Sequence, residues 1–264
     1  MKKAISICLF LLIIFGAIFP QDIETTNIME NKNSGIILFP TAYTKQRGQY
    51  ESKIEMEPFK IKSAIGITQR LMLGVSYGGE HVIGTTDIDW YPKVEFNIKY
   101  RLFDEKQSVP AFAVGFSSDG WGKYLDSAER YLIKSRGFFA VASKDITIIG
   151  GSNVNFGVNY SVEGEDESSG FDIFTSVRKN LNEELSIIGE YDFAINDSGE
   201  NKLGEGKGYL NFGIRWNFAP ELVIDFQLIN VLQNFNTDID NPISVSKKRD
   251  KISRNIAVTY RAFF

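Results

Sequence analysis

The sequence has little cysteine, histidine or proline, and these shortages exclude several kinds of protein. Among 264 residues there are one cysteine (Cys8), one histidine (His81) and seven prolines. A single cysteine forms no internal disulfide, and one cysteine with one histidine does not supply a Cys/His metal site. A Ser–His nucleophile pair would have to use His81, which lies in a predicted loop. We therefore expect that the protein is not an enzyme and that it binds no metal and no cofactor.

Long apolar runs and an excess of one charge are also missing. The formal net charge is −4, with 29 basic and 33 acidic residues, which argues against a nucleic-acid partner. No later stretch approaches the roughly 18 apolar residues that suggest a membrane-spanning helix. The apolar run 5–19 is too short for a span and follows Lys2 and Lys3. It predicts a cleaved signal peptide over residues 1–21, which removes Cys8.

Alternation of apolar and polar residues dominates the rest of the chain. Apolar residues occupy every second position through residues 94–102, 154–162 and 210–218. A period of two predicts strands. A tilted strand needs about 9–11 residues to cross a bilayer, whereas strands of globular proteins are most often about five or six residues long. Lengths of this kind favour a membrane barrel.

The last ten residues carry the most informative of these patterns. Ile256, Val258, Tyr260 and Phe264 share one face of a predicted strand, and the sequence stops on the aromatic Phe264. An apolar face that ends in an aromatic residue is typical of the last strand of a bacterial outer-membrane barrel. We interpret these four residues as the signal that the barrel-assembly machinery reads.

Together these patterns predict an all-β fold, a single antiparallel up-and-down transmembrane β-barrel of about twelve strands. A soluble β-barrel is the class-level alternative. We expect residues 22–47 to be a periplasmic N-terminal segment and residues 48–264 to form the barrel. The predicted strands are 49–57, 59–67, 71–78, 92–103, 109–117, 131–142, 147–162, 171–179, 185–195, 208–218, 222–232 and 252–264.

Short and long connections alternate between these strands, as tight periplasmic turns and longer outer loops do. Residues 143–145 are one of the predicted short turns, and residues 117–130 and 233–251 are two of the long loops. Loop 78–91 is predicted to be solvated, with a constriction of the mouth as the alternative.

The polar face of each strand is predicted to point into a lumen, because a charge on the lipid face costs about 2–4 kcal/mol near the bilayer midplane. Two interpretations stay open: a salt-bridged network that fills a narrow lumen, and a hydrated, cation-lined path that favours anionic solutes. The predicted lumen residues are Lys93, Glu95, Lys99, Arg101, Lys134, Arg136, Glu190, Asp192, Arg215, Asp225 and Arg261.

Other acidic groups allow chemistry that we consider less well supported. Glu190 and Asp192 share a strand face, where paired carboxylates can serve as acid and base, but ion pairs with lumen cations explain them more simply. Residues 163–167 and 238–240 offer hard oxygen ligands for Ca²⁺, without the spacing of a defined calcium loop. An outer-membrane hydrolase that uses His81 is a third hypothesis.

Three short motifs resemble a family of outer-membrane barrels related to the YjbH-like proteins of exopolysaccharide secretion. The resemblance spans roughly residues 35–195 and implies a barrel of this kind, polysaccharide-secretion components as partners, and no catalytic residues. The motifs are residues 35–42 with Gly48 after them, residues 97–105 leading to 110–115, and residues 136–144.

We therefore expect a protein of the outer membrane, surrounded by its lipid. Its expected function is a narrow pore, or a component that assists export of polar solutes such as polysaccharides or anions. The alternative is a non-conducting structural barrel with a salt-bridged lumen, whose outer loops 117–130 and 233–251 bind a partner.

Overall fold

The structure is a computed structural model. The predicted signal peptide and most of loop 233–251 lie outside the residues that it describes. Within the described residues, no helix is long and apolar enough to cross a membrane. The described ranges are residues 34–84, 87–146, 151–164, 170–198, 202–235 and 252–264.

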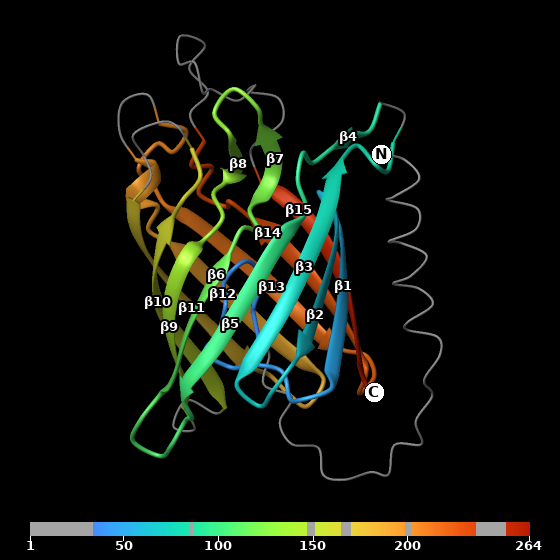
Figure 1. Cartoon of the computed structure of the whole chain (residues 1–264), viewed down its shortest axis with the longest axis vertical. Coiled ribbons are helices and arrows are strands. Elements are labelled where there is room, and N and C mark those ends of the chain that lie inside the picture. Colours follow the sequence, from blue (N-terminus) through green and yellow to red (C-terminus); the bar gives the residue numbers. More distant parts are fainter. Residues whose placement is uncertain (1–33, 85–86, 147–150, 165–169, 199–201, 236–251) are drawn as a thin grey trace.

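Twelve strands close into one antiparallel barrel, as the alternation predicted (Figure 1). Successive strands are neighbours, and the last strand pairs with the first, so the described sheet has no free edge. Because the sheet is closed, the backbone N–H and C=O groups of its strands find their hydrogen-bond partners within the sheet. The strands are β1 (Gln49–Met56), β2 (Phe59–Gly66), β3 (Leu71–Glu80), β5 (Glu95–Phe103), β6 (Ala111–Ser117), β9 (Gly137–Ile146), β10 (Ser152–Ser161), β11 (Gly170–Asn180), β12 (Leu185–Asp192), β13 (Tyr209–Asn217), β14 (Leu222–Ile229) and β15 (Ser253–Phe263).

The connections differ between the two ends of the barrel. One end, which we call the turn end, carries the C-terminus and short turns such as those after β2, β11 and β13. The opposite loop end carries the longer connections after β3, β6 and β12 (Figure 1). The expected alternation of short and long connections is therefore present. An exception is Glu57–Pro58, a two-residue turn between β1 and β2 at the loop end.

Four small elements lie in the loop-end connections and include a hairpin that the sequence analysis missed. The predicted strand 131–142 was wrong at its start, because β9 begins at Gly137, and the predicted turn 143–145 lies inside β9. Gly137 has a φ of +61°, a left-handed conformation that breaks the strand before it. The elements are β4 (Asp89–Trp90), β7 (Trp121–Leu125), β8 (Arg130–Ile133) and the short helix η1 (Ile195–Asp197).

The outer surface of the barrel is apolar, as predicted. Along β5, Phe96 is 59% exposed and Ile98 is 44% exposed, whereas Glu95 and Lys99 are buried in the interior. Along β15, Ile256 and Tyr260 are exposed in the same way. The period-two pattern therefore separates an apolar exterior from the interior of the barrel.

The interior is not uniformly polar, and this corrects the expectation. Strands β6, β9 and β11 turn apolar side chains inward, including Ala113, Val141 and Phe174, which are fully buried. They pack against residues 34–47, which we name the strap and which we had expected to be periplasmic. The strap lies inside the barrel, where Phe39 is 1% exposed (Figure 1). Burial of its apolar side chains explains this position.

Candidate functional site: the lumen and its strap

One carboxylate of the barrel wall binds three backbone groups of the strap. The backbone N–H groups of Ile37, Leu38 and Phe39 donate to the Glu190 carboxylate of β12 at 2.6, 3.0 and 3.3 Å. A turn in which Ile36 N–H donates to Phe39 C=O at 2.9 Å brings these three donors together. Glu190 is 1% exposed, so its charge is balanced by backbone dipoles instead of by water. The contacts of Glu190 with the strap are therefore contacts with its backbone.

Two cations hold the carbonyl groups of the same segment. Arg215 donates through Nη2 to Ile36 C=O at 2.9 Å and pairs with Asp225 at 2.7 Å. Lys99 donates to Thr41 C=O at 2.9 Å and to the carbonyl of Ser34. The strap therefore offers donors to an anion and acceptors to cations.

Apolar packing completes the docking of the strap. The Phe39 ring stacks on Phe174 with centroids 4.9 Å apart, and the Arg136 guanidinium lies 4.7 Å from the Phe39 centroid. Gly157 makes room for this arrangement, because a Cβ there would lie 2.1 Å from Cζ of Phe174. Gly213 likewise faces Ile37, with only 3.0 Å between an added Cβ and the Ile37 Cδ1 atom.

The remainder of the strap is fixed near the turn end. Ala42 N–H donates to Ser143 Oγ at 2.7 Å, and the Tyr43 hydroxyl donates to Glu105 at 2.8 Å. Burial, with the neighbouring Glu105 carboxylate, raises the pKa of Tyr43. Lys45 pairs with Glu51 at 2.7 Å. Burial lowers the pKa of Lys45, and the Glu51 charge opposes that effect.

A second charged network secures the connection after β6 at the loop end. Lys60 pairs with Glu95 at 3.0 Å and with Asp119 at 2.7 Å, and it lies over the Tyr131 ring at 4.8 Å. Lys62 also pairs with Asp119, at 2.7 Å. Burial alone would raise the pKa of Asp119, but Lys60 and Lys62 together lower it below its usual range. The hairpin β7–β8 is thus tied to the wall.

Another buried ion pair ties the hairpin to the connection after β12. Arg130 binds Asp197 through two hydrogen bonds of 2.5 and 2.8 Å, and Tyr209 donates to the same carboxylate at 2.6 Å. Arg130 is completely buried. These contacts, with the apolar cluster around Trp121 and Ile133, fill part of the lumen.

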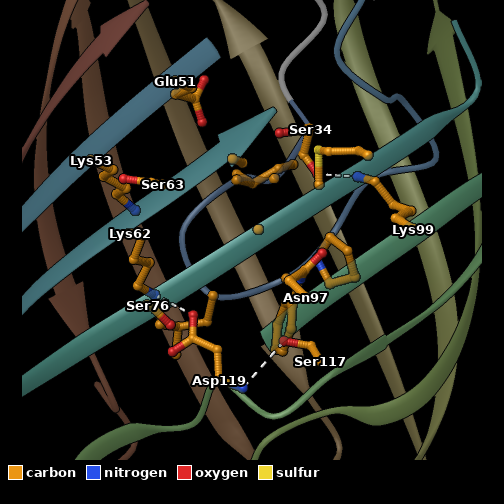
Figure 2. Close-up of a pocket in the computed structure, with 18 of the residues that line it drawn as sticks. Ser34, Glu51, Lys53, Lys62, Ser63, Ser76, Asn97, Lys99, Ser117 and Asp119 are labelled. Atoms are coloured by element: carbon orange, nitrogen blue, oxygen red, sulfur yellow. Dashed lines mark hydrogen bonds and ion pairs between the residues drawn. The ribbon is translucent and has the colours of Figure 1, made fainter. Parts of the chain in front are cut away.

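A cavity of about 160 Å³ remains between the strap and strands β1, β2, β3 and β5. Figure 2 shows Ser63 and Lys62 of β2, Ser76 of β3, and Asn97 and Lys99 of β5 around it. Cationic side chains outnumber carboxylates in its lining. The cations are Lys53, Lys62, Lys99, Arg136, Arg215 and Arg261, and the carboxylates are Glu51 and Asp119.

Most of the predicted lumen residues point inward. Arg101 and Arg261 are half-buried, and Arg101 lies near the turn end, where it pairs with Asp104 at 2.9 Å. Lys93 is exposed in the connection before β5. Whether any of them lines a conducting path stays a prediction. The buried members are Glu95, Lys99, Lys134, Arg136, Glu190, Asp192, Arg215 and Asp225.

The proposed assembly signal lies on the outer surface. Ile256, Tyr260 and Phe264 are exposed, and Val258 between them is half-buried. The geometry is that of a continuous apolar face, and recognition by assembly machinery stays a prediction.

The hydrolase hypothesis gains little from the structure. Residues 74–78 fit the letters of the Gly-x-Ser-x-Gly motif, but they lie in the middle of the extended strand β3 and not at a strand-to-helix turn. Ser76 donates its hydroxyl hydrogen to Glu95 at 2.7 Å. Of the acidic runs, residues 165–167 and 238–240 lie outside the described residues. The described part of the chain contains no group of three His, Cys, Asp or Glu side chains placed to hold a metal.

The sequence analysis missed the strap and the neutral polar residues of the cavity, Ser63, Ser76 and Asn97. The available signal for the strap was the apolar content of residues 36–43, which a solvated periplasmic segment has no reason to carry.

No known protein family and no curated protein matches the sequence. Among solved structures, the chain is similar to a NanC porin at 8% identity, with a TM-score of 0.44, over 82% of this chain and 98% of that one. It is also similar to a chain from a study of in-meso crystallization of membrane proteins, at 11% identity and a TM-score of 0.42, over 82% and 83% of the two chains. A ferric enterobactin receptor from Pseudomonas aeruginosa matches at 10% identity and a TM-score of 0.30, over 78% of this chain and 40% of the receptor. Identities this low carry no information about function.

Proposed function

We propose that the protein is an outer-membrane β-barrel that provides a narrow path for small polar solutes and is closed at rest by its own strap. The observation that carries the proposal is a closed sheet with an apolar exterior and charged residues inside. Exposed side chains such as Phe96 and Phe212 cost about 25 cal/mol per Å² in water, a cost that surrounding lipid removes. A closed barrel is one of the two architectures that span a bilayer.

The cavity is the evidence for a solute path, and the position of the strap is the evidence that the path is gated. Cations outnumber carboxylates in the lining of the space beside the strap, which favours anionic solutes. The strap, which continues into β1 at one end, is held against the lumen side of the other strands by hydrogen bonds and packing alone. Displacement of the strap would join the cavity to the turn end.

A non-conducting structural barrel is the second candidate. The buried pairs Arg130–Asp197 and Arg136–Asp192 and the hairpin β7–β8 favour it, because they fill the interior and rigidify it. Export of polysaccharide, which the sequence resemblance implies, is a further proposal. It requires withdrawal of the strap, since a cavity of about 160 Å³ accommodates only a small molecule.

Single-channel recording in a planar bilayer tests the first proposal. We would compare refolded protein that starts at residue 22 with the same protein lacking residues 34–44. Glu184→Gln, in the exposed turn after β11, serves as a control. We expect small or rare openings from the intact protein and steady, anion-preferring openings from the deletion variant. Lys99→Gln in the deletion background should weaken the anion preference.

Two outcomes would contradict the proposal. If the deletion variant folds, inserts and stays silent, the protein is a structural barrel. If the intact protein and the deletion variant conduct equally, the strap is not a gate.

A further inference from the structure

Strand β3 continues past its barrel partner β5 at the loop end. It pairs with β5 as far as Ser76, and farther along it pairs at Gly79 and Glu80 with the two-residue strand β4 (Figure 1). Just after β4, Tyr91 N–H donates to Gly78 C=O at 3.0 Å, which fastens the segment to the wall. Strand β4 is therefore an addition to the wall that closure of the barrel does not require.

Trp90 of β4 and the next residue, Tyr91, point in opposite directions. Tyr91 is buried, and its hydroxyl donates to Gly122 C=O of the hairpin β7–β8 at 2.9 Å. Trp90 is 43% exposed, and its ring stacks on Tyr77 with centroids 5.8 Å apart and an angle of 10° between the planes. Tyr77 belongs to the outer face of β3, on which Val75 is also exposed. Trp90 therefore extends the outer face of the barrel.

A glycine makes the approach of β4 possible. A Cβ at Gly79 would lie 2.7 Å from the carbonyl oxygen of Asp89 and 3.2 Å from Cε3 of Trp90. The bare backbone thus leaves room for the indole ring to lie across β3 and reach Tyr77. Ile88, two residues before Trp90, is exposed as well. We name the exposed side chains of Tyr77, Ile88 and Trp90 the β4 surface.

The position of the β4 surface indicates what covers it. It is continuous with the apolar outer row of β3, where Leu73 and Val75 are exposed, so the medium that covers this row also covers the β4 surface. Beside it, Lys123 and Asp89 form an exposed ion pair at 3.6 Å. Trp and Tyr favour the zone where hydrocarbon meets headgroups, because one end of each side chain is apolar and the other is polar. An apolar row that ends in stacked aromatic rings beside charged groups fits that zone.

We propose that the β4 surface is a docking site for membrane lipid and rests in the headgroup region of the leaflet at the loop end. Trp90 then holds the connection after β3 outward, while Tyr91 ties the same connection to the hairpin β7–β8. The inference goes beyond the proposed function and rests on it only for the presence of a bilayer around the barrel.

Quenching of tryptophan fluorescence by brominated lipids tests the inference in refolded protein in liposomes. The chain has three tryptophans, so single-tryptophan variants are made by replacing the other two with Phe. Trp216, on the outer face of β13, reports on the bilayer, and Trp121, buried in the lumen, is the negative control. We expect lipids brominated near the headgroup to quench Trp90 at least as strongly as Trp216, and more strongly than lipids brominated at the chain ends.

A matched pair of glycine variants tests the part played by β4. In the protein whose only tryptophan is Trp90, Gly79→Ala should push β4 away from β3 and reduce the quenching by lipid. Gly189→Ala adds the same methyl group to the outer face of β12, where the nearest atom, Phe212 Cε1, is 3.8 Å away, and should leave the quenching unchanged. If Gly79→Ala does not fold, Tyr77→Ser replaces it, because it removes the stacked partner of Trp90.

The outcomes separate this inference from the proposed function. Quenching of Trp216 but not of Trp90 by lipid would refute the inference alone. Acrylamide in the water then distinguishes a β4 surface open to solvent, which it quenches, from one covered by another protein chain, which it does not.

Two further results would also count against a proposal. Unchanged quenching in Gly79→Ala would mean that Trp90 reaches lipid without the pairing of β4 to β3. Absence of lipid quenching at both Trp90 and Trp216 would remove the bilayer itself and with it the proposed function. Lipid quenching of Trp90 in a barrel that never conducts would refute the solute path alone.

Discussion

The two walls of the lumen follow the same strand pattern and yet have opposite interiors. The packed wall, formed by β6, β9 and β11, turns Ala113, Val141 and Phe174 inward against the strap. The polar wall, formed by β2, β3 and β5, turns residues such as Ser63 and Asn97 toward the cavity. The outer face of the barrel is apolar on every strand, as contact with lipid requires. The inner face is apolar only where another segment of the chain covers it. The strap thus divides the lumen into a filled side and an open side.

Of the changes considered, Phe39→Ala should reduce the difference between the two walls most, because it loosens the strap on the packed wall. Phe39 is 1% exposed and stacks on Phe174, so its truncation should cost about 3–5 kcal/mol of strap docking. In protein that starts at residue 22, Leu38→Cys introduces a single thiol on the strap. Its rate of labelling by a water-soluble maleimide should rise about a hundredfold or more. Phe226→Ala, on the outer face, should leave the rate unchanged. Equal rates in all three proteins would mean that the packed wall does not hold the strap.

Glu190→Gln should have the next largest effect. The amide keeps the size of the side chain but loses the charge that accepts three backbone N–H groups. Hydrogen bonds to a charged group contribute about 1.5–3 kcal/mol, so amide exchange at residues 37–39 should accelerate by about 10- to 150-fold. Hydrogen–deuterium exchange measures this rate, with Glu184→Gln as the control. Unchanged exchange would show that the carboxylate is dispensable for docking.

Gly157→Ala should destabilise the packed wall more than Gly213→Ala does. The new Cβ at residue 157 would lie 2.1 Å from Phe174 Cζ, whose ring is held against Phe39. Overpacking of this kind costs about 1–3 kcal/mol. At residue 213 the neighbour is the flexible tip of Ile37, at 3.0 Å, so we expect a change below about 1 kcal/mol. Urea titrations of the folded barrel compare the two variants, and equal midpoints would contradict the difference.

The smallest effect is expected on the polar wall, from Ser63→Ala. Because Ser63 Oγ is buried and has no protein partner within the described residues, its loss should not lower the free energy of unfolding. Ser143→Ala is the matched change on the packed wall. It removes the acceptor of Ala42 N–H at 2.7 Å and should cost about 1–3 kcal/mol. The same urea titrations distinguish the two, and a larger loss at Ser63 would reverse the comparison.

The barrel was predictable because one rule governs its exterior. Every second residue of a strand faces lipid and must be apolar, as Phe96, Ile98 and Tyr100 are. This pattern identifies the strands whether the inward-facing residues are polar or apolar. The limits of β9 were less predictable. Residues 131–133 are buried in succession because the hairpin packs in an apolar cluster with residues such as Ile36 and Leu203, so the period-two rule does not apply to them.

The strap and the cavity could not be derived in the same way. Side chains that point inward are free to be polar or apolar, depending on a segment that is distant in sequence, as Ile37 and Glu190 are. Local pattern reports which face a residue occupies, and it does not report what the residue meets there. Lys99 and Arg215 were assigned to the inner face because a charge on the outer face is too costly in lipid. Their binding to strap carbonyls was not visible in the sequence.

The attachment of the strap to β1 gives it an advantage over any free molecule. Gly48, with a φ of +78°, joins the strap to the first strand, and its carbonyl accepts a hydrogen bond from Phe264 N–H at the seam of the barrel. The strap is therefore an intramolecular ligand, and a short tether corresponds to an effective concentration in the millimolar range. A solute that competes for Lys99 or Arg215 must match that concentration or bind more tightly than a backbone carbonyl does.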